Sequence, residues 1–158
     1  MQNTLEKAVF GAGCFWHIEE EFKKLKGVVS TSVGFMGGGF KNPSYKDVCT
    51  GRTGHAEVVY LEYDPKVISY EKLLEVFWNI HDPTTLNRQG PDIGTQYRSV
   101  IFFHTGEQEK TANASKIKLE KSGRFKNKVV TEIKPAQDFY KAEEYHQKYF
   151  EKQKRCIL

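Results

Sequence analysis

Cys14 is the residue in this sequence best placed for covalent chemistry. It stands between Gly13 and Phe15, where a short apolar run typical of a buried strand meets a helical pattern. Amides at a helix start favour negative charge, so a thiol there is biased towards thiolate. The dipole contributes only about 0.3–1 kcal/mol and lowers a thiol pKa of about 8.5 by less than one unit. We therefore expect either a nucleophile helped by another polarising group or by its substrate, or a buried inert thiol.

Glu57 is the second candidate, because it heads an apolar strand face. Side chains alternate along a strand, so the predicted strand 55–63 places Glu57 on one side with Val59, Leu61 and Tyr63. Burial disfavours a charged carboxylate and should raise the pKa of Glu57 from about 4.3, so that it can donate a proton at pH 7. Such a shift takes roughly 3–4 kcal/mol, which burial can supply. The alternative is a glutamate at a strand edge that faces water.

Other catalytic motifs are incomplete or missing. His55-Ala56-Glu57 matches half of the signature of zinc nucleotide deaminases, but those enzymes also need a C-x-x-C, and the cysteines stand at positions 14, 49 and 156. The sequence contains no GxGxxG, Walker or G-x-S-x-G motif. We therefore expect thiol or redox chemistry without a metal or a cofactor.

Hydrophobic spacing predicts the elements that position these residues. Strands are expected over 7–13, 28–35, 55–63, 98–104 and 129–133, and helices over 15–26, from Ser69, and from a Thr105/Gln108 capping box to about Ser122. This order indicates an α+β, two-layer, ferredoxin-like (split βαβ) sandwich with a mainly antiparallel sheet; a thioredoxin-like arrangement is the main alternative. The long loops 40–53 and 82–96 are where function is expected. Residues 139–150 should form a short helix laid on the domain, followed by an extended, charged C-terminal tail.

Length and composition favour one globular domain over residues 1–158. A chain of 158 residues, 39% hydrophobic and 28% charged, can bury a core without disulfides. Three cysteines, no visible signal peptide and no apolar run long enough for a bilayer indicate a cytoplasmic protein without a membrane anchor. The densest basic stretch, 116–134, is explained better by a solvated helix face than by nucleic-acid binding, and a basic binding module is the second hypothesis.

Several linked motifs resemble the A-type peptide methionine sulfoxide reductases. They are Gly13-Cys14-Phe15-Trp16, Gly37-Gly38, and the stretches 45–59, 81–84, 87–99 and 139–147. The resemblance covers about residues 7–150 and implies reduction of methionine S-sulfoxide, free or in proteins, to methionine. It assigns Cys14 as the nucleophile and Phe15 and Trp16 as walls of a pocket for the substrate methyl group. It places the side chains of Glu57, Tyr45 and Tyr97 around the sulfoxide oxygen. It assigns Asp92 to support of the site.

The resemblance also implies a redox cycle. Cys14 becomes a sulfenic acid, a resolving thiol forms a disulfide with it, and thioredoxin reduces that disulfide. We expect Cys156 to resolve, because many relatives resolve from a C-terminal tail and its basic neighbours promote a thiolate; Cys49 is the alternative. The expected protein is a monomer whose residues 151–158 form a mobile tail, and His17 and Phe35-Met36 depart from the usual motif without touching a predicted catalytic role.

Overall fold

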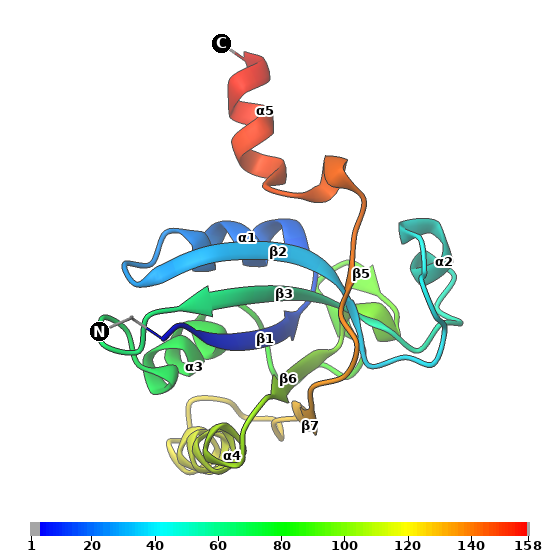
Figure 1. Ribbon diagram of the computed structural model, residues 1–158. Coiled ribbons are helices and arrows are strands. Elements are labelled where there is room, and N and C mark those ends of the chain that lie inside the picture. The colour runs from blue at the N-terminus through cyan, green and yellow to red at the C-terminus, as the bar shows by residue number, and fades with distance from the viewer. Residues whose placement is uncertain (1–3, 158) are drawn as a thin grey trace.

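A six-stranded sheet forms the centre of the molecule in a computed structural model that describes residues 4–157, with side chains to residue 153 (Figure 1). The strand order is β7-β6-β1-β3-β2-β8. The strands are β1 (Glu6–Ala12), β2 (Val28–Met36), β3 (Ala56–Tyr63), β6 (Ser99–Phe103), β7 (Glu132–Pro135) and β8 (Tyr140–Lys141). Neighbours run antiparallel except β6 and β7, which are parallel because a helix connects them. The chain therefore has an α+β fold.

Three longer helices begin close to where the sequence predicts them. They are α1 (Phe15–Lys23), α3 (Tyr70–Asn79) and α4 (Gly106–Lys121). The Ser69 hydroxyl accepts the Lys72 amide at 3.1 Å, and the Thr105 hydroxyl accepts the Gln108 amide at 3.1 Å, so both predicted N-caps are confirmed. The reciprocal half of the Thr105 capping box is wrong, because the Gln108 side chain accepts the His104 amide instead, at 2.8 Å.

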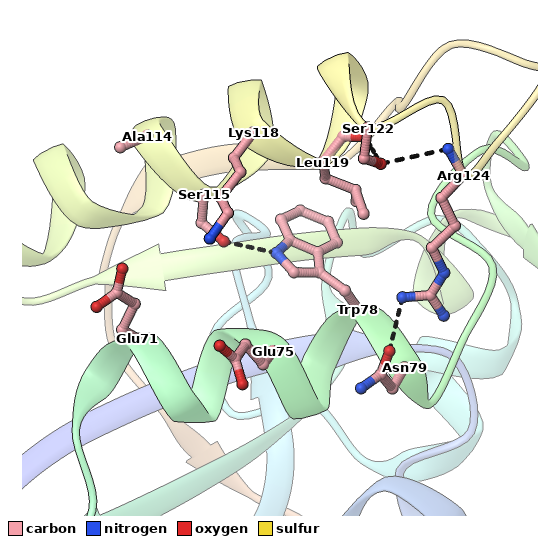
Figure 2. Close-up of a pocket in the computed structure, with 10 residues that line it drawn as sticks. All are labelled: Glu71, Glu75, Trp78, Asn79, Ala114, Ser115, Lys118, Leu119, Ser122 and Arg124. Carbon is pink, nitrogen blue, oxygen red and sulfur yellow. Dashed lines mark hydrogen bonds between the residues drawn. The ribbon is translucent and has the colours of Figure 1, made fainter.

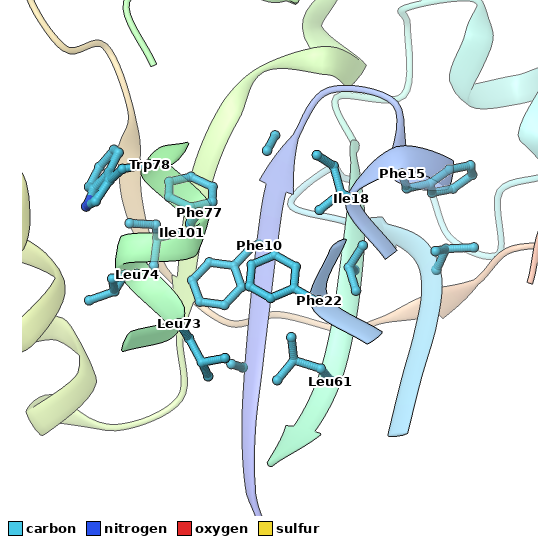
Figure 3. Close-up of a cluster of buried hydrophobic side chains, with 14 of the residues drawn as sticks. Phe10, Phe15, Ile18, Phe22, Leu61, Leu73, Leu74, Phe77, Trp78 and Ile101 are labelled. Carbon is cyan, nitrogen blue, oxygen red and sulfur yellow. The ribbon is translucent and has the colours of Figure 1, made fainter. Parts of the chain in front are cut away.

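The main core lies between the sheet and the helices α1 and α3 (Figure 3). Phe10 of β1 is fully buried there, and its ring centroid lies 5.1 Å from that of Phe22 on α1 and 5.2 Å from that of Phe77 on α3. Because side chains alternate along β1, Val9 points to the opposite face and joins a smaller apolar cluster with Phe102. Both faces of the central strands are therefore buried, which fixes the register of β1 and β3.

The two long loops contain short elements that spacing alone does not predict. Loop 40–53 holds α2 (Tyr45–Cys49), and loop 82–96 holds β4 (Arg88–Gln89), β5 (Asp92–Ile93) and the start of the 3-10 helix η1 (Thr95–Tyr97). Helix α2 begins with a capping box, in which the Ser44 hydroxyl accepts the Asp47 amide and the Asp47 carboxylate accepts the Ser44 amide. Local hydrogen bonds therefore order these segments.

The C-terminal segment differs from the prediction. A short helix over 139–150 is wrong: residues 140–141 form β8 on the edge of β2, followed by the 3-10 helix η2 (Glu144–His146). The Gln147 side chain then holds this segment to β2 through the Val33 amide and carbonyl, at 2.8 and 2.9 Å. In place of an extended tail, α5 (Tyr149–Ile157) leads away from the sheet (Figure 1). No helix in the described part of the chain is both long and apolar enough to cross a bilayer.

Candidate active site

Cys14 lies at the junction of β1 and α1, as predicted, and is the N-cap residue of the helix. The turn depends on Gly13, whose φ is +101°, a conformation that side-chain-bearing residues rarely adopt. A Cβ at this position would lie 2.8 Å from Cγ of Gln89. The missing side chain thus lets the β4–β5 hairpin pack directly against the segment that carries the thiol.

The surroundings of Cys14 keep its thiol protonated. Its pKa is raised to about 11, chiefly by burial and also by the negative charges of the carboxylate forms of Glu57 and Asp92, against the lowering effect of the Trp16 and His17 amides. The helix start acts in the predicted direction, but burial outweighs it. The expected bias towards thiolate in the free protein is therefore wrong, and activation of Cys14 has to come with the substrate.

Glu57 is buried on the apolar face of β3, with 1% of its surface exposed, so the water-facing alternative is wrong. Its Oε1 accepts the Phe15 amide at 3.3 Å, and its Oε2 is buried without a hydrogen-bond partner among the described residues. Burial raises the pKa of Glu57 to about 8, the Phe15 amide lowers it, and the charge of Asp92 raises it. At pH 7 the acid form then exceeds the carboxylate by about ten to one. The expected rise of the Glu57 pKa on burial is confirmed, and its role as proton donor stays a prediction.

The structure brings five of the predicted site residues into one electrostatic group. Tyr45 begins α2 and Tyr97 ends η1. Burial raises the pKa of Tyr45 well above its usual range and that of Tyr97 to about 12, and the charge of Glu57 raises both. Asp92, on β5, raises the pKa of Cys14, Glu57 and Tyr97. The site therefore combines a thiol, a neutral carboxyl group and two neutral phenols beside one acidic side chain.

Phe15 and Trp16 have different surroundings. Phe15 is buried in the main core, whereas Trp16 is only partly buried. The Trp16 indole N–H donates to Nδ1 of His146 at 3.0 Å, and its ring stacks on Tyr149 with centroids 4.0 Å apart. His146 and Tyr149 were not predicted as site residues, although the aromatic residues of 139–150 were the signal that could have found them.

The other two cysteines stand in different positions. Cys49 ends α2 and is exposed, and its charge adds to the effect of burial in raising the pKa of Tyr45, which places it beside the same site. The backbone of Cys156 belongs to α5, but its side chain lies outside the described residues. Its role as the resolving thiol stays a prediction.

His55, the first residue of the H-x-E sequence, has a structural role. Its Nδ1 accepts the Gly38 amide at 3.0 Å, and its Nε2 lies 2.6 Å from the Phe40 carbonyl oxygen, to which it can donate. Both ring nitrogens are thus used to hold the glycine-rich turn after β2. This turn precedes α2 and so helps to position Tyr45.

The basic stretch 116–134 lies on α4 and the segment after it. A cavity of about 410 Å³ between α3 and α4 is lined there by side chains of both charges (Figure 2), among them Glu71, Glu75, Lys118 and Arg124. Within the basic stretch, Lys116 donates to the Thr131 carbonyl at 3.0 Å. The mixed charge and internal contacts differ from the uniformly basic patch typical of nucleic-acid binding.

Comparison with known proteins gives one consistent family. The model of the family "Peptide methionine sulfoxide reductase" matches residues 6–157. A peptide methionine sulfoxide reductase MsrA from Methanothermobacter thermautotrophicus is 63% identical over 97% of this chain and 92% of its own length. MsrA 1 from Nostoc sp. is 65% identical over 94% and 91%.

Solved structures agree with the sequence comparison. Mxr1 from Saccharomyces cerevisiae in its reduced form is 40% identical, with a TM-score of 0.88 over 96% of this chain and 87% of that one. The same yeast protein in complex with Trx2 is similar at 27% identity and a TM-score of 0.64, over 94% of this chain and 89% of that one.

Proposed function

The chain belongs to the peptide methionine sulfoxide reductase family, and on this premise we propose that Cys14 reduces methionine S-sulfoxide, free or in proteins, with Glu57 as the proton donor. The protein is an oxidoreductase that acts on methionine sulfoxide. One observation carries the assignment of roles: a buried carboxyl group with a pKa of about 8 lies in the same electrostatic group as the Cys14 thiol.

The first step transfers oxygen from one sulfur to the other. A sulfoxide sulfur is a poor electrophile until its oxygen is protonated, and Glu57 holds a proton at neutral pH. As Glu57 gives this proton to the oxygen, the Cys14 sulfur attacks the substrate sulfur and the thiol proton returns to the carboxylate. The S–O bond of the substrate breaks, the hydroxyl group bonds to the Cys14 sulfur, and methionine leaves as the transient S–S bond breaks. Cys14 gives up the two electrons that reduce the sulfoxide and becomes a sulfenic acid, so the step needs no external proton.

Tyr45 and Tyr97 supply further donors for the sulfoxide oxygen. Both phenols are neutral at pH 7 because burial raises their pKa values, so each O–H can donate. Donors held in place before the substrate arrives stabilise developing negative charge without reorganisation. We assign Asp92 to support of this site, and the partly buried Trp16 with Phe15 to the pocket for the substrate methyl group, where sulfur–aromatic contact is favourable by about 0.3–1.5 kcal/mol.

Helix α5, which carries Cys156, leads away from the sheet (Figure 1). Its first turn is anchored on α1, because Tyr149 stacks on Trp16 and Lys23 pairs with Glu151 at 2.9 Å. Cys156 comes seven residues after Tyr149, or about 10 Å further along the helix axis. A disulfide needs Cα atoms within about 7 Å, whereas the same seven residues in extended form span about 23 Å. We propose that α5 unwinds and folds back over Cys14.

Thioredoxin is the proposed reductant of the resulting disulfide. The solved complex of the yeast relative with Trx2 supports this assignment. Exchange would start at Cys156, which leaves Cys14 reduced for the next cycle. A monomer in the cytoplasm remains the prediction for the working protein.

The finer fold assignment is also a proposal. The strands β6-β1-β3-β2 are neighbours in this order and pair antiparallel, and α1 and α3 provide the two crossovers. This arrangement supports a ferredoxin-like split βαβ unit, to which β7 and β8 add one strand at each edge.

The test uses methionine S-sulfoxide with and without reductant. With dithiothreitol the wild type should form methionine over many cycles, and Cys14→Ser should form none; turnover in Cys14→Ser would overturn the nucleophile. Without reductant, mass spectrometry should locate a disulfide between Cys14 and Cys156. Cys156→Ser should complete one turnover and then fail to cycle with thioredoxin. Cys49→Ser is the matched control and should continue to cycle. Continued cycling in Cys156→Ser would overturn the resolving step.

A further inference from the structure

Two exposed apolar side chains belong to the segment that also carries two residues of the catalytic group. Among the described residues, Ile93 and Leu86 are the most exposed large hydrophobic side chains, at 73% and 69%. Both belong to segment 82–97, which also carries Asp92 and Tyr97. Large apolar groups held in water are unfavourable and often mark a binding surface. We name Leu86 and Ile93 together the apolar rim.

Hydrogen bonds hold this segment in one shape. The Gln89 side chain accepts the Asp82 amide at 2.9 Å and donates to the Asp82 carbonyl at 2.6 Å. The Gly94 amide donates to the Asn87 carbonyl at 2.9 Å and closes the hairpin. The apolar rim is therefore presented by an ordered loop, and a ligand that covers it would not have to order the loop first.

The rim lies close to the reacting thiol and beside a cavity. Gln89, on the same hairpin, packs against Gly13, and Asp92, which precedes Ile93, acts electrostatically on Cys14. Leu86 lines a cavity of about 570 Å³, which is also lined by Gly51 and Arg52 from the segment after α2. This space can accept a side chain of a chain that crosses the site.

We propose that the apolar rim binds the apolar residues that flank a methionine sulfoxide in a polypeptide substrate, so that Leu86 and Ile93 favour sulfoxides with apolar neighbours in the sequence. The proposal rests on the proposed function. Consecutive Cα atoms of a polypeptide are only about 3.8 Å apart. When the substrate sulfur is at Cys14, the residues on either side of the sulfoxide therefore have to pass over the elements next to the thiol. Methionine is usually buried among apolar residues, which become exposed with it on unfolding.

Thioredoxin is the other partner that comes to this part of the molecule, because the proposed disulfide lies at Cys14. Its exchange starts at one sulfur atom, that of Cys156, whereas a polypeptide substrate lays residues on both sides of its sulfoxide across the elements next to the thiol. We therefore assign the rim to the substrate polypeptide.

The test compares three substrates with dithiothreitol as reductant: free methionine S-sulfoxide, a peptide with its sulfoxide between leucine and valine, and a peptide of equal length with serine and glycine there. Leu86→Ser and Ile93→Ser should each lower kcat/KM for the apolar peptide about tenfold, the change expected for partial burial of one such side chain. The effect should appear in KM. Turnover of the other two substrates should change less than twofold.

Ile117→Ser is the matched control, because Ile117 is 52% exposed on α4, away from the hairpin. It should leave all three substrates unchanged. An equal loss on both peptides, or no loss on either, would overturn the proposal. A loss seen only when thioredoxin replaces dithiothreitol would also overturn it and assign the rim to the reductant. Failure of the wild type to reduce free methionine S-sulfoxide would instead refute the proposed function.

Discussion

Replacing Glu57 with glutamine should stabilise the protein by an amount that depends on pH. The folded protein holds Glu57 as the acid, because its pKa is about 8, whereas the unfolded chain returns it to an ordinary value of 4.5. A group whose pKa is raised by folding contributes most stability below the unfolded pKa, and this contribution is lost as pH rises to the folded pKa. Glutamine has nearly the same shape, keeps an acceptor for the Phe15 amide and never ionises.

The size of the effect follows from the two pKa values. Each pH unit between 4.5 and 8 lowers the free energy of unfolding of the wild type by about 1.4 kcal/mol relative to Glu57→Gln. The variant should therefore gain about 3 kcal/mol on the wild type between pH 4.5 and pH 7, and little more above pH 8. Solvent hardly screens this effect, because Glu57 is 1% exposed.

Urea unfolding of both proteins at pH 5, 6, 7, 8 and 9, with the cysteines kept reduced, measures this difference. Glu62→Gln, on the same strand, is the control for removing a carboxylate from β3. A difference between wild type and Glu57→Gln that stays flat from pH 5 to 8 would refute the buried acid. A slope shared with Glu62→Gln would assign the effect to general charge and not to burial of Glu57.

Three further perturbations test the surroundings of the thiol. Cys14, with a pKa of about 11, should react slowly with iodoacetamide at pH 7 and about tenfold faster per pH unit up to pH 10, and fast labelling at pH 7 would contradict its burial. Gly13→Ala should lower the free energy of unfolding by about 1–3 kcal/mol in urea, because the positive φ and the contact with Gln89 both oppose a Cβ; a loss below about 0.5 kcal/mol would refute this. Trp16→Phe should cost about 1–3 kcal/mol in the same assay, because it leaves buried His146 without its donor, and an unchanged unfolding midpoint would show that this bond does not stabilise the fold.

The sequence predicts the parts of the fold that depend on hydrophobic spacing. Phe15, Ile18 and Phe22 share one face of α1 and are all buried, as a helical period requires. The alternation that places Glu57 on the core side of β3 is also confirmed. A long helix or strand has many apolar positions, and together they indicate which of its faces is buried. Its type and its buried face can therefore be predicted from the sequence.

Short elements depend on partners far along the chain. Strand β8 has two residues and exists because it pairs with β2. Helix α2 has five residues, and the spacing of Ser44 and Asp47 was its only available signal. Helix α5 is anchored by the stacking of Tyr149 on Trp16, a contact between residues that are distant in the sequence.

The candidate site follows the same division. The positions of Cys14 and Glu57 can be predicted from the sequence, but the protonation of Cys14 cannot, because it depends on burial by distant segments and on the charge of Asp92. His146 could not be recognised as the acceptor of the Trp16 indole for the same reason, since 130 residues separate them. The electrostatics of a site depends on the tertiary structure. Whether the pKa of a thiol rises or falls is decided by the balance between burial, which raises it, and local dipoles, which lower it.

The most direct test of the central claim is the rate of the reductase step as a function of pH. Rapid mixing of reduced protein with excess methionine S-sulfoxide, without reductant, gives the single-turnover rate of methionine formation. If neutral Glu57 donates the proton, the wild-type rate should be flat from pH 5.5 to 7 and fall about tenfold per pH unit above pH 8, and Glu57→Gln should be slower and lack this fall. A wild-type rate that rises steadily through pH 8, or a Glu57→Gln variant as fast as the wild type at pH 7, would contradict the account.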